Sequence, residues 1–236
     1  TTVLDASNPP FYRWFTGASL NTCFNALDRH VRDGRGDQIA MYYDSPVTGT
    51  KASFTYAALL DQVSRFAGAL AGLGVTKGDR VLIYMPMIAQ ACFAILACAR
   101  IGAIHSVVFG GFASGSLATR IDDAKPTLIV SSDAGMRGGK AVPYKHLLDE
   151  AIELAEHKPA KVLMVDRGLD KGFNKVAGRD VDYATLREQH MDAQVPCEWM
   201  ESSEPSYILY TSGTTGKPKG VQRDTGGYAV ALASSM

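Results

Sequence analysis

The residue types best suited to binding an anion gather in one segment of this chain, 206–221, which reads SYILYTSGTTGKPKGV. An apolar run ends at Tyr210, and the next ten residues hold three glycines, four hydroxyl side chains and two lysines. Glycines let the backbone turn so that its N–H groups face a ligand, the hydroxyls add neutral donors, and the lysines add positive charge. This combination predicts a polyphosphate-binding loop.

The loop is not of the Walker A type, because that pattern, G-x-x-x-x-G-K-[ST], requires glycine at the position of Thr211 and a hydroxyl residue at Pro218. Pro218 also lacks the backbone N–H that a helix start would offer to phosphate. The alternative interpretation is a flexible glycine- and threonine-rich hairpin with two solvated lysines, since such a composition is common in turns.

A second candidate anion site is the segment 135–140, GMRGGK, whose cations are Arg137 and Lys140. The alternative is a solvated loop between a strand and a helix, because lysine and arginine are ordinary surface residues. Gly110 and Gly111 in VVFGGF end a predicted parallel strand, and ligands of α/β proteins gather at such strand ends. These two glycines either let a ligand approach the backbone or form a tight turn.

Several other polar and aromatic residues are predicted to have structural roles. His105 opens a predicted core strand, so we expect a structural histidine there. Asp122 and Asp123 follow each other near a helix end, where we expect them to be solvated and without a partner for acid–base catalysis. An aromatic cluster is predicted to anchor the N-terminal arm, and it comprises Tyr12, Trp14 and Phe15.

The overall composition excludes several classes of partner. Equal numbers of basic and acidic residues, 24 of each, give no net charge and therefore no global field to attract nucleic acid or an acidic membrane. A hydrophobic share of 46% with 20% charged residues is typical of a globular protein rather than a disordered one. No apolar run is long enough to span a membrane and no signal-peptide pattern is present, so we predict a cytosolic location.

The four cysteines, Cys23, Cys92, Cys98 and Cys197, are widely separated in the sequence. They form no C-x-x-C pair and no Cys/His cluster of the kinds that build zinc sites or redox pairs. We therefore predict four buried or inert free thiols.

The elements that must position the candidate sites follow from the hydrophobic pattern. Short apolar runs alternate with helical stretches, which predicts an α/β fold with a mostly parallel sheet flanked by helices. The predicted strands are 81–85, 105–109, 127–131 and 161–165. The predicted helices are 20–31, 56–73, 88–101, 114–124 with Ser114 as its N-cap, and 144–157.

The segment 166–182 is charged and rich in glycine, so we predict a surface excursion before the strand pattern resumes at Tyr207. An apolar helix is expected after Gly227. The predicted organisation is an N-terminal arm with leading helices (1–80), a parallel α/β unit with the cationic loop (81–205), and the phosphate-loop strand with the start of a further unit (206–236). The chain starts without Met and stops inside a predicted helix, so we expect both ends to be cut.

The ten residues 211–220 agree at every position with T-S-G-[ST]-T-G-x-P-K-G. This string resembles the phosphate-binding signature of the adenylate-forming superfamily, which includes acyl-CoA synthetases, amino-acid adenylation domains and luciferases. Three further segments are similar to the short-chain acyl-CoA synthetases, the acetate– and propionate–CoA ligase branch: 11–31, 54–86 and 96–120. Two shorter phrases look most like the propionate enzymes: 84–91 and 223–230. The resemblance implies the N-terminal part of that fold, without the rest of its large domain and the small C-terminal domain.

The resemblance also implies residue roles. In that family the loop holds the β- and γ-phosphates of ATP with Mg²⁺, which here implies a cradle of Thr211, Ser212, Gly213, Thr214, Thr215, Gly216, Lys217 and Lys219. Acetate–CoA ligases carry R-x-x-R against the nucleotide phosphates of coenzyme A, which implies CoA contacts from Arg137, Gly138, Gly139 and Lys140, with Gly110 and Gly111 near the adenine. Lys140 keeps the charge of the second arginine but not its bidentate fork.

The activity implied by the resemblance is ATP-dependent activation of a short-chain carboxylate, propionate before others, as an acyl-adenylate that is transferred to CoA with release of AMP and pyrophosphate. The family's carboxylate pocket and catalytic lysine are expected downstream, so we assign no catalytic or metal-ligating residue. We expect the chain alone to be inactive and to self-associate. The alternatives are an acetate–CoA ligase, an amino-acid adenylation domain and a non-catalytic nucleotide-binding module.

Overall fold

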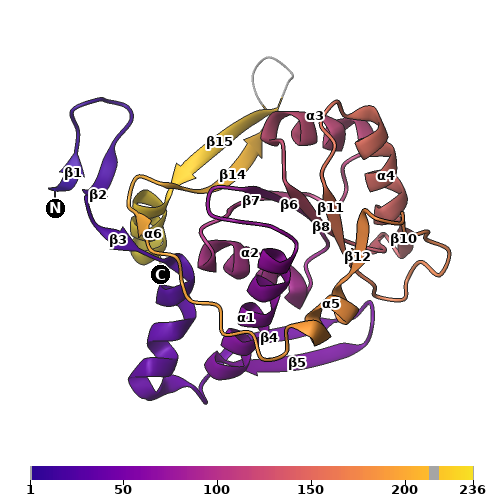
Figure 1. The fold of residues 1–236 in the computed structure, drawn as a ribbon, viewed down its shortest axis with the longest axis horizontal. Helices are drawn as coiled ribbons and strands as arrows, with labels where there is room; N and C mark the ends of the chain where they lie inside the picture. The colour runs from indigo at the N-terminus through magenta and orange to yellow at the C-terminus, as the bar shows by residue number, and fades with distance from the viewer. Residues whose placement is uncertain (1, 213–217, 236) are drawn as a thin grey trace.

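A seven-stranded sheet forms the centre of the protein in the computed structural model, which describes residues 2–212 and 218–235 (Figure 1). The strand order is β12-β11-β8-β6-β7-β14-β15, and every neighbouring pair is parallel except β14 and β15. The strands are β6 (Arg80–Tyr84), β7 (Ile104–Val108), β8 (Leu128–Ser132), β11 (Lys161–Val165), β12 (Asp180–Asp182), β14 (Pro205–Thr211) and β15 (Lys219–Asp224). The predicted mostly parallel α/β fold is confirmed.

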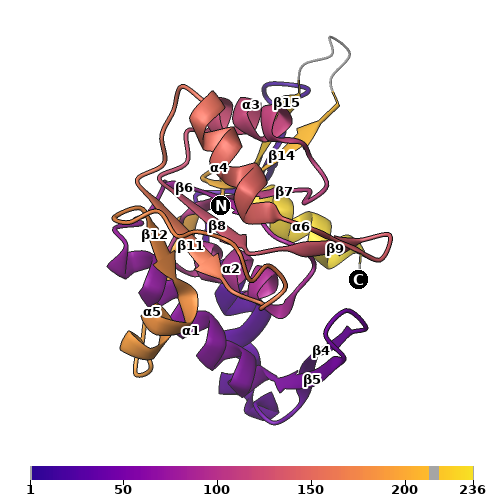
Figure 2. The same cartoon turned by 90° about the vertical axis from the view of Figure 1, so that its right-hand side faces the viewer.

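Helices cover both faces of this sheet, and Figure 2 shows α3 and α4 on one side with α1 and α5 on the other. The helices are α1 (Tyr56–Gly72), α2 (Ala89–Arg100), α3 (Ser114–Ala124), α4 (Tyr144–Leu154), α5 (Tyr183–Gln189) and α6 (Thr225–Ser235). Val81 and Ile83 face the core beneath α1 and α2, whereas Leu82 and Tyr84 face the core beneath α3 and α4. Burial on both faces explains why the strand sequences are apolar without alternation.

The start of α3 and the end of α4 differ from the predictions. Ser114 lies inside α3 rather than at its N-cap, and its hydroxyl donates to the Glu150 carboxylate at 2.7 Å. Helix α4 ends at Leu154 and not at residue 157, because the backbone turns to an extended conformation at Ala155. The Lys158 ammonium then donates to the carbonyls of Ile152 and Ala155, which satisfies acceptors at the helix end.

The predicted helix 20–31 begins later and continues as two π-helical turns, η1 (Phe24–Asp28) and η2 (Val31–Arg35). The wider winding is visible in the bond from the Arg29 N–H to the Phe24 carbonyl, five residues back. Gly34 breaks the regular helix with a φ of 79°. Periodicity alone does not distinguish π turns from α turns over so short a stretch.

The segment 166–182 is not only a surface excursion, because its end forms the edge strand β12, paired with β11. Charge holds this edge in place. The Lys145 side chain is 1% exposed and its ammonium lies 3.0 Å from the Asp180 carboxylate, which also accepts from Arg179. A buried ion is stable only when it is paired with an opposite charge. The charged residues of this segment, which predicted solvent exposure, therefore form ion pairs inside the fold.

Helix α6 starts at Thr225, before the predicted position. The Thr225 N–H and hydroxyl both donate to the Glu204 carbonyl, at 2.9 and 2.8 Å, and the Asp224 carboxylate accepts from the Gly227 N–H. The N-terminal arm lies beside this helix (Figure 1). The side chains of Tyr12 and Phe15 in that arm are 50% and 39% exposed.

Four short antiparallel ribbons complete the fold: β1 (Thr2–Asp5) with β2 (Arg13–Thr16), β3 (Ser19–Leu20) with β13 (Met200–Glu201), β4 (Ile39–Ser45) with β5 (Thr50–Thr55), and β9 (Gly135–Arg137) with β10 (Lys140–Val142). Among the described residues, no helix combines the length and the apolar character that crossing a membrane requires.

Candidate nucleotide and coenzyme site

The cationic segment 135–140 forms a hairpin rather than a loop between a strand and a helix. Arg137 and Lys140 are directly opposed across β9 and β10, and the turn between them is Gly138–Gly139. Both glycines have positive φ, 56° and 77°, as a tight two-residue hairpin turn requires. The hairpin projects from the body of the protein (Figure 2), so its two exposed cations face solvent together.

Gly110 and Gly111 meet this hairpin in space although they are distant from it in sequence. A methyl group on Gly111 would lie 3.1 Å from the Arg137 guanidinium, and one on Gly110 would overlap the Tyr144 hydroxyl. The two predicted CoA-contact motifs therefore lie side by side. Gly110 also has a packing reason to be glycine, because the Tyr144 ring leaves no room for a side chain.

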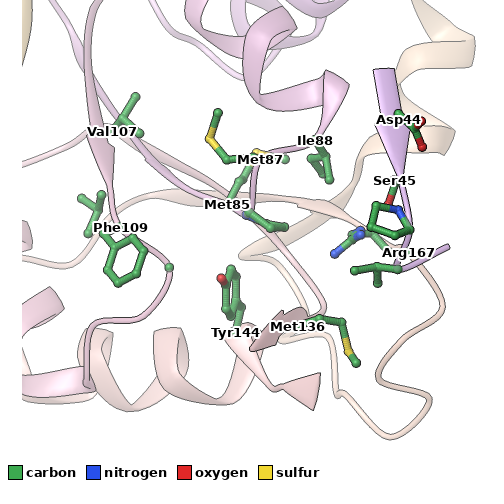
Figure 3. Close-up of a pocket in the computed structure, with 15 residues that line it drawn as sticks. Asp44, Ser45, Met85, Met87, Ile88, Val107, Phe109, Met136, Tyr144 and Arg167 are labelled. Atoms are coloured by element: carbon green, nitrogen blue, oxygen red, sulfur yellow. The ribbon is translucent and has the colours of Figure 1, made fainter. Parts of the chain in front are cut away.

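A pocket of about 600 Å³ lies next to these residues, beyond the carboxyl ends of β6 and β7 (Figure 3). Its walls are mostly apolar and include Met85, Met87, Ile88, Val107, Phe109 and Met136. Tyr144 and Arg167 bring a hydroxyl and a cation into it. Mostly apolar walls with a few polar groups at a strand-end crevice are typical of a ligand pocket in an α/β protein.

Tyr144 in the pocket wall stacks on Tyr84, which is fully buried. The ring centres are 4.9 Å apart with the planes inclined by 30°, and the Tyr84 hydroxyl donates to the Phe112 carbonyl at 3.2 Å. Burial raises the pKa of both phenols above the ordinary value, so both are neutral near pH 7. The Tyr144 phenol can therefore donate or accept a hydrogen bond, but it adds no charge.

The buried Asp133 carboxylate organises the loop that carries Arg167. It accepts from the backbone N–H groups of Arg167, Leu169 and Asp170 at 2.7–3.1 Å. The Arg167 guanidinium donates to the Ala134 carbonyl at 3.0 Å, which fixes the side chain beside the pocket. Sequence reasoning missed Tyr144 and Arg167. Arg167 lies two residues after the end of a predicted strand, and that position is a signal for a ligand contact.

The predicted phosphate loop connects β14 and β15. Thr211 pairs with Lys219 at the end of this hairpin, and Ser212 follows β14 directly. The other predicted cradle residues, Gly213, Thr214, Thr215, Gly216 and Lys217, lie outside the described residues. Since β14 runs parallel to β7, Thr211 lies at the same edge of the sheet as Gly110. Both candidate sites therefore lie at the carboxyl ends of the parallel strands.

Helix α3 supports the strand that leads into the phosphate loop. The Tyr210 hydroxyl donates to the Asp123 carboxylate at 2.7 Å, and burial followed by this contact raises the pKa of the phenol. Asp122 accepts from the His157 N–H at 2.8 Å. The prediction that both acids are merely solvated was wrong, because each holds a neighbouring segment.

Arg120 connects the two candidate sites. Its guanidinium lies 4.1 Å from the Phe112 ring centre and 5.3 Å from that of Tyr210. Phe112 in turn packs edge-on against Phe109, so these two rings flank the Gly110–Gly111 turn. A shift of the glycine turn or of β14 would therefore change the surroundings of the same buried guanidinium, that of Arg120.

His105 has a structural position, as predicted, although one of its ring nitrogens lacks a hydrogen-bond partner among the described residues. The ring is buried against Tyr207 with centres 5.6 Å apart, and its Nδ1 finds no hydrogen-bond partner among the described residues. Burial lowers the pKa to about 4, so the ring is neutral near pH 7. It lies in the first part of β7, away from the strand end that borders the pocket.

The prediction of free thiols is confirmed for all four cysteines. Two of them nevertheless lie close together in the fold. The Sγ atoms of Cys23 and Cys197 lie within 4.8 Å of each other although 173 residues separate them in the chain. Cys92 and Cys98 are free thiols on α2, as predicted. Spacing along the sequence does not reveal a pair that only the fold brings together.

Comparison with known proteins adds the family. Residues 27–236 match the model of the AMP-binding enzymes, and residues 1–26 match that of the acetyl-coenzyme A synthetase N-terminus. The chain is 62% identical over 236 residues to the propionate–CoA ligases of Salmonella typhimurium and Escherichia coli, covering 100% of this chain and 37% of each relative. It is 52% identical to the human mitochondrial acyl-CoA synthetase short-chain family member 3, covering 34% of that protein.

The chain thus spans about a third of the length of the curated relatives it matches. The resemblance to short-chain acyl-CoA synthetases is confirmed along the whole sequence, and not only at the phosphate-loop signature. The chain belongs to the AMP-binding enzyme family.

Proposed function

We propose that this chain supplies the ATP-phosphate loop and part of the coenzyme A surface of an AMP-forming acid–thiol ligase, with propionate as the favoured carboxylate. The proposal rests on one observation above all: the Gly110–Gly111 turn and the Arg137–Lys140 hairpin meet at the same strand-end edge toward which β14 runs. Propionate is favoured because the relatives that are 62% identical carry that substrate in their name.

The phosphate loop would act by charge neutralisation. Pyrophosphate leaves an attacked α-phosphate readily only when donors already in position meet its developing negative charge. Thr211, Ser212 and Lys219 begin and end the loop, and Gly213, Thr214, Thr215, Gly216 and Lys217 complete the proposed cradle. Mg²⁺ would accompany the phosphates of ATP, as it does in phosphoryl transfer generally.

The coenzyme surface would combine the two opposed cations with the apolar pocket. Arg137 and Lys140 offer charge to the phosphates of the CoA nucleotide, with Gly138 and Gly139 providing backbone N–H groups in the turn. The adenine would lie against the Gly110–Gly111 turn, in which Gly111 is partly exposed while Gly110 is buried against the Tyr144 ring. Lys140 holds a phosphate as a point charge, whereas Arg137 can hold one through two parallel hydrogen bonds.

The first test is carboxylate-dependent exchange between ATP and pyrophosphate, measured on the full-length protein with C2 to C6 carboxylates. A ligase with this preference exchanges fastest with propionate, while a non-catalytic nucleotide-binding module shows no carboxylate-dependent exchange. Exchange driven by amino acids instead would identify an adenylation domain. One methylene contributes only about 1–3 kcal/mol in a hydrophobic pocket, so acetate is expected to be a slower substrate rather than an inert one.

Arg137→Ala separates the two half-reactions. Because CoA enters only after the adenylate has formed, we expect the KM for CoA to rise about tenfold or more, as loss of a charge-assisted contact predicts, with unchanged ATP–pyrophosphate exchange. The matched control is Arg32→Ala, which removes another exposed arginine, from η2. An unchanged KM for CoA in the Arg137 variant contradicts the assigned role.

A cytosolic location and self-association of the isolated chain stay predictions from the sequence. The name of the human relative assigns that protein to the mitochondrion.

A further inference from the structure

A compact polar cluster lies away from the nucleotide and coenzyme site, where the N-terminal helical stretch meets the coil before β13. Cys23 is fully buried, and Cys197 is partly exposed on the coil. Their sulfur atoms and a carboxylate oxygen of Asp28 all lie within 4.8 Å of one another. The cluster joins two segments from opposite ends of the sequence.

Arg100, at the end of α2, provides the positive charge of this cluster. Its guanidinium binds both oxygens of Asp28, at 2.9 and 3.0 Å, and its Nη1 lies 3.6 Å from the Cys23 sulfur. Its Nε donates to the Val195 carbonyl, two residues before Cys197. A thiolate that forms here meets a nearby cation that is already fixed in place.

The backbone on both sides of the two cysteines is held firmly. The Asn21 amide donates to the carbonyls of Ala99 and Glu198, both at 2.7 Å, and the Glu198 N–H donates to the Arg100 carbonyl at 2.7 Å. These bonds connect Glu198, which follows Cys197, to Asn21, which lies two residues before Cys23. The close approach of the sulfurs is therefore built into the packing, since a buried amide with three polar contacts does not move freely.

A divalent metal fits this cluster poorly. Asp28 already gives both carboxylate oxygens to Arg100, and a metal bound to the two thiolates would lie next to that guanidinium. Zinc sites are normally completed by four ligands, and the group contains three candidate ligands among the described residues. The same cation that opposes a metal favours a thiolate.

We propose that Cys23 and Cys197 form an oxidation-sensitive thiol pair, in which a peroxide converts the two thiols to a reversible disulfide with Cys197 as the residue attacked first. Cys197 is the more exposed of the two residues, whereas Cys23 is fully buried. The contact with Cys23, and then the charge of Arg100, lower the pKa of the Cys197 thiol against the opposing effects of burial and of the Asp28 carboxylate; the pKa of Cys23 is raised by its contact with Cys197 and by burial.

The chemistry balances with hydrogen peroxide as the oxidant. The Cys197 thiolate attacks one peroxide oxygen, the O–O bond breaks, and the products are a sulfenic acid and hydroxide, which takes up a proton to become water. The Cys23 sulfur then attacks the sulfenic sulfur, the S–O bond breaks, and the Cys23 proton leaves with the oxygen as a second water. Two thiols and one peroxide give one disulfide and two waters.

The test uses the full-length protein treated with hydrogen peroxide, followed by alkylation and peptide mass spectrometry. We expect one cross-linked peptide pair that joins Cys23 to Cys197 and disappears on treatment with dithiothreitol. In Cys23→Ser the sulfenic acid at Cys197 has no resolving partner, so dimedone labels Cys197; in Cys197→Ser the buried Cys23 stays reduced. Cys92→Ser is the matched control, because Cys92 is also partly exposed, and it should behave like the wild type.

Several results would overturn the proposal. One is dimedone labelling of Cys197 that is equal in the wild type and in Cys23→Ser, because it would mean that Cys23 does not resolve the sulfenic acid. Another is that the thiols react with peroxide only after a chelator has removed one equivalent of zinc, because that result would identify a metal site instead. If Cys23→Ser does not fold, the wild type decides: iodoacetamide should modify Cys197 about tenfold faster than Cys92, and equal rates contradict the proposal.

Discussion

Gly110 and Gly135 both face the phenol of Tyr144, and that contact gives these glycines a role the sequence did not indicate. Methyl groups at the two positions would fall at or within 2.6 Å of the Tyr144 hydroxyl. Tyr144 stacks on Tyr84 and belongs to the pocket wall, so it cannot move aside without disturbing the pocket. At the residue scale, the proposed coenzyme surface would depend on the absence of side chains as much as on the two cations.

Gly110→Ala is therefore expected to lower the stability of the protein by about 1–3 kcal/mol, as overpacking in a core does, and to raise the KM for CoA. The matched control is Gly115→Ala in α3, where an added methyl meets nothing within 4 Å. That change should leave the KM for CoA unaltered and stabilise the helix by up to about 1 kcal/mol. Thermal unfolding and steady-state kinetics of both variants measure these effects; equal melting temperatures for the two would refute the packing argument.

At the scale of single elements, strand β12 shows how charge substitutes for hydrophobic burial at a sheet edge. The strand is short, and its first residue, Asp180, has a side chain with no exposed surface. Burial alone would raise the pKa of that carboxyl, but hydrogen bonds from Arg179, the Val176 N–H and Lys145 together lower it. The carboxylate is therefore ionised in the fold at pH values where it is partly protonated in the unfolded chain.

The stability of the fold therefore depends on pH through Asp180. A lowered carboxyl pKa stabilises the fold fully above the unfolded-state value of about 4, and this stabilisation is lost as the pH falls below it. Asp180→Asn should destabilise the protein by about 3 kcal/mol at pH 7, because it removes the buried carboxylate shared by Lys145 and Arg179 and leaves Asp149 as the remaining anion beside Lys145. The variant should also lose less stability than the wild type between pH 5 and pH 3. Urea unfolding across that range tests both statements, and an equal acid dependence would disprove the second.

At the scale of the whole molecule, the two halves of the candidate site lie far apart in sequence but at the carboxyl ends of neighbouring parallel strands. Arg120 lies between Phe112 at the glycine turn and Tyr210 at the end of β14. Strand β14 pairs with β7 at the register position of Tyr207 and His105, and the bond from Tyr210 to Asp123 adds an attachment to α3 near the end of the strand. Helix α3 thus holds the end of the strand that leads into the predicted phosphate loop.

Tyr210→Phe removes this hydrogen bond while keeping the ring beneath Arg120. We expect the KM for ATP to rise several-fold, consistent with a bond to a charged group worth about 1.5–3 kcal/mol, with little change in the KM for CoA. Tyr42→Phe, at a side chain that is 80% exposed, is the control. A parallel rise in both Michaelis constants would instead mean that the variant disturbs the whole edge of the sheet.

Much of the architecture could be predicted because it depends on local pattern. The central strands begin and end within one residue of the predicted ranges, since buried parallel strands are short apolar runs that glycine, proline and charge delimit. The candidate site motifs were found for a similar reason, because glycine turns and adjacent cations are local features. Helix ends were less accurate, as at Leu154, because backbone acceptors and distant side chains decide where a helix stops.

By itself, the sequence determined the α/β class, the strand positions, and the two motifs on which the family assignment and the proposed ligands rest. Only the tertiary structure decided which distant groups meet: Gly111 with Arg137, Tyr210 with Asp123, and Cys23 with Cys197. The physical reason is that hydrophobic periodicity reports which face of an element is buried, whereas contacts between elements depend on packing that no single segment encodes. Asp123 and Cys197 look unremarkable in sequence because their roles are defined by partners many residues away.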